Sequence, residues 1–164
     1  MTTIRRYRPG DAPAVRTLHE RVVRAAGTDL GDIPGAADVA DIEGAYLETG
    51  GEFLVAERDG RLVGMGGLAV DGDEGELFRM RVAVDCQREG VGSQLLDALE
   101  EAARERGAAR LYTETARRQS AALAFYPANG YEQVDARTDG EYDLVTYRKD
   151  LRPESASGER REET

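Results

Sequence analysis

Residues 85–96, DCQREGVGSQLL, place Gly90 and Gly92 at the start of an amphipathic helix, directly after the apolar run 82–84. Glycine is a poor helix former, so neither residue is there for its helix propensity. The first amides of a helix have no intrahelical acceptor and lie at the positive end of its dipole, where they can bind phosphate. Because glycine has no Cβ, it lets the backbone approach an anion closely. The stretch therefore predicts either a phosphate-binding loop or a tight strand-to-helix turn that needs glycine.

Two familiar phosphate-binding motifs do not account for this loop. The dinucleotide fingerprint G-x-G-x-x-G is absent, and the strand order expected below differs from that of a Rossmann domain. A P-loop requires Gly-Lys-Ser/Thr, but the only lysine of the chain is Lys149, far from these glycines. Phosphate binding here would use another arrangement.

The length of the chain, 164 residues, predicts a single domain. We expect this domain to span residues 1–151 and the acidic, apolar-poor segment 152–164 to be a disordered tail. No apolar run approaches the length of a membrane span, and the first residues, MTTIRRYRPG, lack the apolar region of a secretory signal. These features predict a soluble, cytoplasmic protein without a membrane partner.

The chain is strongly acidic, with a formal net charge of -10 at pH 7 and a pI of about 4.7. A nucleic-acid surface needs a basic face, so this balance argues against a nucleic-acid partner. The acidic residues are spread along the whole chain, which is typical of the general solvation found in halophilic proteins. The same charge would attract cationic amine substrates. The sequence leaves both explanations open.

Few residues are available for metal or acid–base chemistry. Cys86 is the only cysteine and His19 the only histidine, so an intramolecular disulfide and a cysteine-rich zinc site are excluded, and we expect no bound metal. Proton transfer at neutral pH then has to come from carboxylates, a tyrosine or a perturbed thiol. Without a base partner, Cys86 is a poor nucleophile. His19 falls near the apolar stripe of the first helix, where we expect it to be structural or to line a substrate site.

The hydrophobic pattern predicts elements in the order β-α-α-β-β-β-α-β-α-β-β. The turn Asp59-Gly60 between two apolar runs is a strong hairpin signal, and Gly107 marks the end of the helix that follows the glycine loop. Hairpins in the first half and β-α-β in the second indicate an α+β, or mixed α/β, fold. The expected strands are 3–9, 52–58, 61–70, 75–84, 109–116, 131–137 and 142–151, and the expected helices are 11–23, 38–48, 91–106 and 118–128, with a loop at 27–36.

Two stretches resemble a known family. Residues 78–107 are similar to the acyl-CoA-binding motif of the GNAT superfamily of acyl-CoA-dependent N-acetyltransferases, whose signature Q/R-x-x-G-x-G/A is matched by Gln87, Gly90 and Gly92. Residues 111–131, LYTETARRQSAALAFYPANGY, resemble the strand, helix and FY…GY ending that follow in that family, at the expected separation. The resemblance implies a GNAT-like central mixed sheet of about six or seven strands flanked by about four helices.

The resemblance implies acetyl-CoA as acyl donor, held by the glycine loop and by the strand before it. In the family the coenzyme's diphosphate lies on the loop amides, and its pantetheine arm pairs with backbone groups of that strand. The same strand supplies an amide near the thioester oxygen. A helical asparagine that contacts the arm in many relatives is replaced here by Gln119. The implied donor-binding residues are Met80, Arg81, Val82, Gln87, Arg88, Glu89, Gly90, Val91, Gly92, Ser93, Gln119 and Tyr126.

The resemblance also implies direct transfer of an acetyl group to an amine, which needs a base for the amine and an acid for the departing thiolate. Tyr126 corresponds to the family tyrosine that hydrogen-bonds the coenzyme sulfur and is the expected acid. Glu114, on the same strand face as Tyr112, resembles the base of members that acetylate protein N-termini. Glu76 on the preceding strand, acting through water, is the competing base. Pro127 departs from the family pattern, because proline disfavours helical geometry at the residue before it and removes an N–H.

The expected function is N-acetylation of a primary amine carried by a small molecule, a peptide or a protein. The loops at 27–36 and 137–142 show no pattern that selects among these acceptors. The alternative hypothesis is a catalytically silent coenzyme-A-binding sensor or interaction module, which the departures at Gln119 and Pro127 motivate. A third hypothesis is an α+β domain that binds no coenzyme. Analogy with the family adds the expectation of a homodimer.

Overall fold

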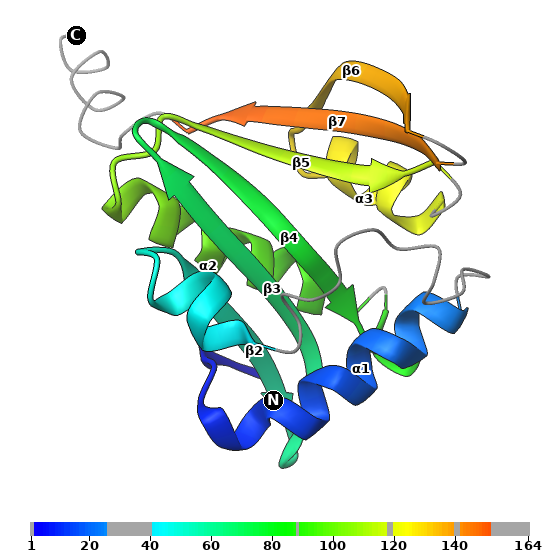
Figure 1. The fold of residues 1–164 in the computed structure, drawn as a ribbon. Helices are drawn as coiled ribbons and strands as arrows, with labels where there is room; N and C mark the ends of the chain where they lie inside the picture. Colours follow the sequence, from blue (N-terminus) through cyan, green and yellow to red (C-terminus); the bar gives the residue numbers. More distant parts are fainter. Residues whose placement is uncertain (1, 26–40, 88, 118–119, 140–141, 152–164) are drawn as a thin grey trace, which may run out of the picture.

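The computed structural model describes residues 2–25, 41–87, 89–117, 120–139 and 142–151 (Figure 1). The strands are β1 (Thr2–Arg6), β2 (Glu52–Arg58), β3 (Arg61–Asp71), β4 (Glu74–Val82), β5 (Arg110–Ala116), β6 (Glu132–Asp139) and β7 (Tyr142–Asp150). The α-helices are α1 (Ala12–Ala25), α2 (Val91–Glu105) and α3 (Ser120–Ala128), and the short helical turns are η1 (Pro9–Asp11), η4 (Glu43–Leu47) and η5 (Val84–Cys86). No helix in these ranges is both long enough and apolar enough to cross a membrane.

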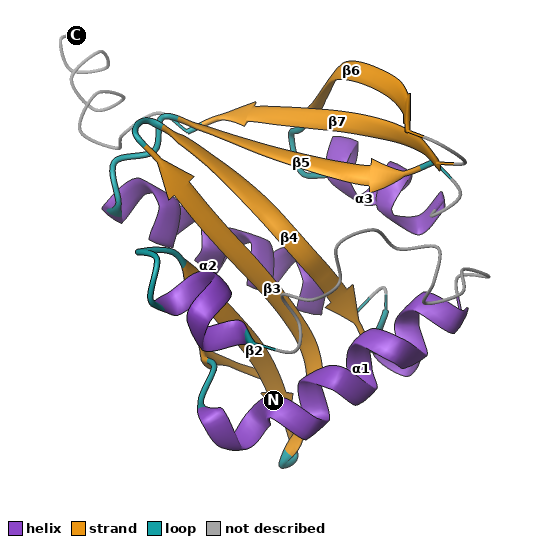
Figure 2. Ribbon diagram, in the orientation of Figure 1, coloured by secondary structure: helices purple, strands orange, loops and turns teal. Residues whose placement is uncertain are grey.

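Seven strands form one sheet in the order β1-β2-β3-β4-β5-β7-β6. Strands β4 and β5 run parallel, and the other neighbours run antiparallel. Figures 1 and 2 show α1 and η4 on one face of the β2-β3-β4 half and α2 on the other, with α3 against the β5-β7-β6 half. This arrangement confirms the predicted α+β class and the expected number of strands.

The β2–β3 hairpin forms where the sequence predicts it. Asp59 and Gly60 have positive φ angles of 54° and 77°, and Arg58 pairs with Arg61 across the turn. Two-residue hairpin turns of this kind need positive φ at both central positions, which favours Asp-Gly. The residue types Asp and Gly at these two positions are therefore enough to explain this turn.

Strands β4 and β5 pair over a short stretch and then diverge, as Figure 1 shows. Residues 74–77 of β4 pair with residues 110–113 of β5. Beyond that point β4 stays paired with β3 as far as Val82, while β5 stays paired with β7 as far as Ala116. The sheet is thus split between its two halves, and beyond the split one edge of each strand has no strand partner among the described residues.

A β-bulge in β4 accompanies the split. Met65 pairs with Arg81 and Gly67 with Phe78, so a single β3 residue lies opposite two residues of β4. One of these two, Arg79, has a φ of 57°, in the left-handed region that non-glycine residues rarely adopt. A bulge bends its strand and increases the local twist, which is consistent with β4 turning away from β5 here.

Helix α2 packs on β3 with the apolar stripe that the sequence predicts. The buried residues of this stripe are Val91, Leu95, Leu96, Leu99, Ala102 and Ala103. Each fully buried leucine contributes roughly 1.5–3 kcal/mol. The helix lies close to the strand because β3 presents glycines to it. A Cβ on Gly64 would stand 2.7 Å from Leu95 Cδ1, and one on Gly66 would stand 2.8 Å from Leu99 Cδ1.

Helix α3 differs from the expectation drawn from Pro127. The helix continues through Pro127 to Ala128, so the prediction that proline disturbs the helix at Tyr126 is wrong. Proline in the last turn removes one N–H, which would otherwise bond the carbonyl four residues earlier. That carbonyl, Leu123 O, instead lies 3.5 Å from the hydroxyl of Tyr147, which donates to it.

The segment before β2 is helical, as predicted, over the part that the structure describes. A helix is expected at 38–48, and the described residues form the π-helical turn η4 within this range. Tyr46 of this turn is buried against Phe53, with ring centroids 5.2 Å apart, so the turn still closes the core. The loop predicted at 27–36 and the tail predicted at 152–164 lie outside the described residues.

Candidate active site

The junction between β4 and α2 presents backbone amides that precede the helical hydrogen-bond ladder. Gly90 is the N-cap of α2, and no described side chain caps the first turn. The first helical hydrogen bond runs from Gln94 N to Gly90 O at 3.0 Å. The amides of Val91, Gly92 and Ser93 therefore have no intrahelical acceptor. With the helix dipole behind them, these amides can bind phosphate or another anion.

The two glycines serve different purposes. Gly90 has a φ of 89°, and a Cβ there would meet nothing within 4 Å, so its backbone conformation is what requires glycine. Gly92 has ordinary helical geometry, but a Cβ there would stand 3.1 Å from Phe125 Cε1 of α3. The tight-turn explanation therefore holds for Gly90, whereas Gly92 is explained by close packing against α3, and neither residue has a side chain that covers the amides.

Gln87 holds the start of this loop against the strand. Its side-chain Nε2 donates to Val82 O at 3.0 Å, which closes the segment between them. Glu89 forms an ion pair with Arg58 of β2. The intervening Arg88, one of the predicted donor-binding residues, lies outside the described residues, as does Gln119.

Met80, Arg81 and Val82 lie on the part of β4 that has separated from β5. Among the described residues, no strand pairs with the β5-facing edge of β4 beyond Leu77. An extended ligand can pair with an open strand edge as an added strand would. The split therefore exposes the backbone groups to which the resemblance assigns the pantetheine arm.

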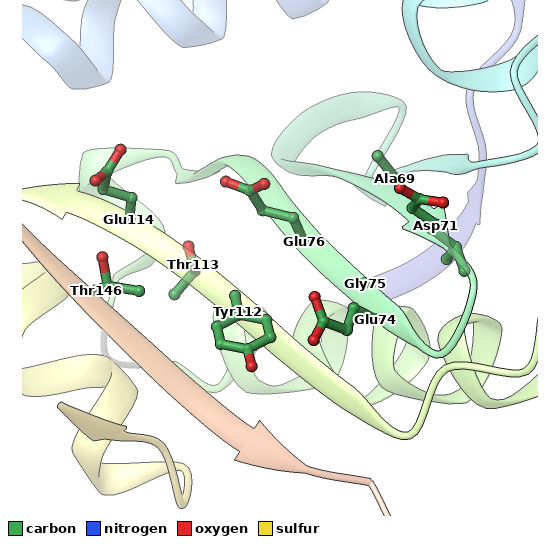
Figure 3. A pocket seen from close by; sticks show the side chains of 10 residues that line it. Ala69, Asp71, Glu74, Gly75, Glu76, Tyr112, Thr113, Glu114 and Thr146 are labelled. Carbon is green, nitrogen blue, oxygen red and sulfur yellow. The ribbon is translucent and has the colours of Figure 1, made fainter. Parts of the chain in front are cut away.

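A pocket of about 440 Å³ lies on the sheet across β3, β4, β5 and β7 (Figure 3). Of the 10 residues that line it, four are acidic: Asp71, Glu74, Glu76 and Glu114. The other lining residues include Tyr112, Thr113 and Thr146. The structure thus brings the two candidate bases, which the sequence left as alternatives, into one pocket.

Glu76 combines solvent access with a perturbed carboxyl group. The residue is exposed at the pocket, and it has no hydrogen-bond or ion-pair partner among the described residues. Desolvation by the surrounding pocket raises the pKa of Glu76, and the negative charge of Glu114 raises it further. A carboxylate with a raised pKa and free oxygens is suited to accept a proton.

Glu114 lies on the same pocket wall but is engaged by an arginine. Arg137 of β6 donates from Nε to one carboxylate oxygen at 2.8 Å and from Nη2 to the other at 3.0 Å. This fork-to-fork geometry is the strongest that a carboxylate and a guanidinium adopt. Both oxygens of Glu114 are therefore engaged by Arg137, whereas those of Glu76 have no partner among the described residues.

Tyr126 does not line the acidic pocket and is buried on α3, with an exposed fraction of 4%. Its ring stacks on Tyr147, with centroids 5.8 Å apart, and meets Tyr131 edge to face at 5.5 Å. Burial raises the pKa of Tyr126 to about 12, against the opposing effects of a hydrogen bond with Thr113 and the charge of Arg81. The phenol is therefore protonated at neutral pH and can donate a proton.

Thr113 connects the acidic pocket with Tyr126, and the sequence did not single it out. It lines the pocket and hydrogen-bonds with Tyr126. Its hydroxyl also donates at 3.4 Å to the carbonyl oxygen of Leu77, which is the last residue of β4 that pairs with β5. It therefore sits where the two strands begin to diverge. Its position next to Glu114 in the sequence is the only local signal for this placement.

The remaining candidates for acid–base or metal chemistry are buried elsewhere. His19 on α1 is 4% exposed and Cys86 on η5 is 2% exposed. Within the described ranges, no group of three or more His, Cys, Asp or Glu side chains is arranged to hold a metal ion.

Comparison with known sequences shows which proteins this chain is similar to. The model described as the acetyltransferase (GNAT) family matches residues 20–131, more than half of the chain. The [ribosomal protein bS18]-alanine N-acetyltransferase of Escherichia coli K12 is 35% identical over 79 residues, which cover 44% of this chain and 53% of that protein. The chain spans about half the length of the curated relatives it matches.

Solved structures share the fold. An acetyltransferase of the GNAT family from Staphylococcus aureus Mu50 aligns with a TM-score of 0.83 at 22% identity, covering 93% of this chain and 100% of that one. A structure from Salmonella typhimurium, determined with its cofactor acetyl-CoA, aligns with a TM-score of 0.74 at 21% identity, covering 93% of this chain and 95% of that one. At these identities the likeness concerns the fold, and it confirms the expected GNAT-like sheet.

Proposed function

The chain belongs to the acetyltransferase (GNAT) family, and we propose that it transfers the acetyl group of acetyl-CoA to a primary amine by direct attack. The observation that carries this proposal is the split between β4 and β5, which leaves an edge of β4 without a strand partner, in the described part of the chain, beside an acidic pocket. The uncapped start of α2 follows the end of the same β4 edge. A donor site and an acceptor site can therefore meet at the split.

The residues present fit the donor. The amides of Val91, Gly92 and Ser93 would hold the diphosphate. The open backbone of residues 80–82 would pair with the pantetheine arm. When bound, acetyl-CoA supplies the acetyl group as an activated thioester.

We assign the base to Glu76. An amine attacks only in its neutral form, so a base has to take a proton from the protonated acceptor. Glu76 faces the pocket, has a raised pKa and has no partner among the described residues. Glu114 would instead position the pocket wall through its pair with Arg137 and add the negative charge that raises the pKa of Glu76.

We assign the acid to Tyr126. As the acetyl group moves from sulfur to nitrogen, the C–S bond breaks and the departing sulfur takes the phenolic proton. Burial keeps that proton on Tyr126 at neutral pH. Thr113, hydrogen-bonded to the phenol at the point of the split, would orient it. Glu76 would pass the proton that it takes from the protonated amine to solvent between turnovers. The nitrogen would lose a second proton as the amide forms, and this proton would replace the one that Tyr126 gives to the sulfur.

Two measurements test the function as a whole. Titration calorimetry with acetyl-CoA is expected to show binding, and thiol release over a panel of amines is expected to show turnover with at least one of them. Binding without release by any amine would favour the coenzyme-A sensor hypothesis. Absence of binding would leave only a structural α+β domain.

The acceptor is expected to be a cationic amine. Four carboxylates line the pocket, whose volume suits a small molecule or the end of a peptide. The Escherichia coli relative is named for an alanine of a ribosomal protein, so the panel should include peptides with N-terminal alanine as well as small amines. We expect 1,4-diaminobutane to have a KM about tenfold below that of butylamine, with 4-aminobutyrate the poorest of the three. Equal KM values at low salt would contradict the charge argument.

Substitution of Gly92 is expected to weaken donor binding. In Gly92→Leu the side chain has to displace Phe125, because even a Cβ would lie 3.1 Å from that ring, and the start of α2 must shift. We expect the affinity for coenzyme A to fall at least about tenfold, because diphosphate binding depends on the position of the amides. Calorimetry measures this loss, and Gly10→Leu, at an exposed position where a Cβ would meet nothing within 4 Å, is the control. Wild-type affinity in Gly92→Leu would refute the loop assignment.

A further inference from the structure

The turn between β2 and β3 makes contacts with the segment before α2 that the donor site does not require. Arg58 Nη1 pairs with Glu89 Oε1 at 2.5 Å, and Arg61 Nη2 pairs with Asp85 Oδ2 at 3.1 Å. Both guanidinium groups also contact the buried sulfur of Cys86, at 3.7 and 3.8 Å. Two arginines from one turn therefore hold the chain that leads into the glycine loop.

The two ion pairs differ in rigidity and in position. The Arg58 side chain is 24% exposed, whereas Arg61 is 55% exposed. Arg58 is also fixed by a hydrogen bond from its Nε to Thr2 Oγ1 at 3.1 Å. Its partner Glu89 is the residue immediately before Gly90, whereas Asp85 lies in η5. Glu89 is therefore the closer of the two acidic partners, along the chain, to the amides that would receive a diphosphate.

Glu89 puts a negative charge where the proposed ligand is itself an anion. An uncompensated carboxylate beside a diphosphate repels it, and the repulsion between unit charges about 4 Å apart is about 1 kcal/mol even in water. The guanidinium of Arg58 cancels this charge and holds the carboxylate in one direction. The pair as a whole is neutral, so the attraction of the loop amides for an anion is preserved.

We propose that Arg58 is a positioning residue that sets the affinity for coenzyme A, because it neutralises Glu89 beside the backbone amides that would bind the diphosphate. This inference rests on the proposed function. Donor affinity then follows the net charge of the pair, which is zero in the wild type and in the double variant Arg58→Gln/Glu89→Gln. Arg58→Gln leaves one negative charge, and Glu89→Gln leaves one positive charge.

Calorimetry with coenzyme A on these four proteins tests the proposal. Relative to the wild type, we expect Arg58→Gln to bind about tenfold more weakly and Glu89→Gln about threefold more tightly, with the double variant within about twofold. Raising the salt from about 0.02 M to about 0.5 M should reduce the difference between the two single variants, because added ions screen partly exposed charges. Arg61→Gln, from the same turn and with the same sulfur contact, is the matched control and should change the affinity less than about twofold.

A purely structural tie predicts a different result. If the pair only braces the loop, both single variants and the double variant bind equally weakly, and that outcome overturns the proposal. Equal KM values of all variants for S-acetylpantetheine, which lacks the diphosphate, are expected, and a loss with this donor in Arg58→Gln would also overturn it. Absence of coenzyme A binding by the wild-type protein would overturn the proposed diphosphate site itself. Tight binding with the same affinity in all variants, whatever the net charge of the pair, would overturn this inference alone.

Discussion

Replacing Glu76 by glutamine is expected to lower kcat at least about 100-fold, because loss of a general base typically costs two to four orders of magnitude. Glutamine keeps the shape of the side chain but cannot accept the proton of the attacking amine. The affinity for coenzyme A should stay within about twofold of the wild type, since Glu76 lines the acceptor pocket on the part of β4 that still pairs with β5. Steady-state thiol release and calorimetry together measure the two effects.

The matched control is Glu114→Gln, which makes the same chemical change on the neighbouring strand. Glu114 is bound by Arg137, so we expect a smaller fall in kcat, of about tenfold or less. A large fall in kcat in Glu114→Gln, with little change in kcat in Glu76→Gln, would assign the base to Glu114 instead.

The pH profile provides a second measurement for the same prediction. The base has to be deprotonated, so kcat/KM should fall as the pH falls through the raised pKa of Glu76. The acidic limb should therefore lie above the range of an ordinary glutamate. Glu114→Gln removes the negative neighbour that contributes to this raised pKa, so the limb should move to lower pH in that variant. If the acidic limb lies at the same pH in Glu114→Gln as in the wild type, a group other than Glu76 causes it.

Tyr126→Phe is expected to lower kcat about 100-fold while leaving the affinity for coenzyme A nearly unchanged. The phenylalanine ring keeps the aromatic contacts with Tyr147 and Tyr131 but has no proton for the departing sulfur. Because burial raises the pKa of Tyr126 to about 12, the wild-type kcat should show no alkaline limb from this group near neutral pH. Single-turnover thiol release isolates the affected step.

Tyr112→Phe is the control for this prediction. Tyr112 lines the pocket on the same strand as Thr113 but is not among the aromatic neighbours of Tyr126. We expect its kcat to stay within about threefold of the wild type. Unchanged turnover in Tyr126→Phe would remove Tyr126 as the proton donor, and an equal loss in both variants would point to a general effect on packing.

Sequence reasoning predicted the parts of this fold that depend on neighbouring residues. The Asp59-Gly60 turn needs positive φ at two positions, and these residue types favour it. The apolar stripe of α2 follows from a helical period of 3.6 residues, and the buried leucines occupy it as predicted. The glycine loop could be located for the same reason. Its function as a donor site is a proposal that residue identity and helix polarity both support.

The candidate site was less accessible to sequence reasoning, because it depends on strands that meet across the sheet. The sequence left Glu114, which resembles the family base, and Glu76, acting through water, as alternative bases. Only the strand order β5-β7-β6 brings Arg137 onto Glu114, and only the pairing of β4 with β5 brings Glu76 into the same pocket. The bulge at Arg79 has no signal in the sequence either, since this residue type rarely adopts positive φ.

The sequence by itself determined the order of the elements, the α+β class, the hairpin and the glycine loop, because each depends on residue types within a few positions of one another. The tertiary structure decided where the sheet splits, which carboxylate is paired and which is available, and how Thr113 meets Tyr126. The physical reason is that a pKa or an ion pair depends on distances through space. Those distances are set by strand register and packing between segments far apart in the chain.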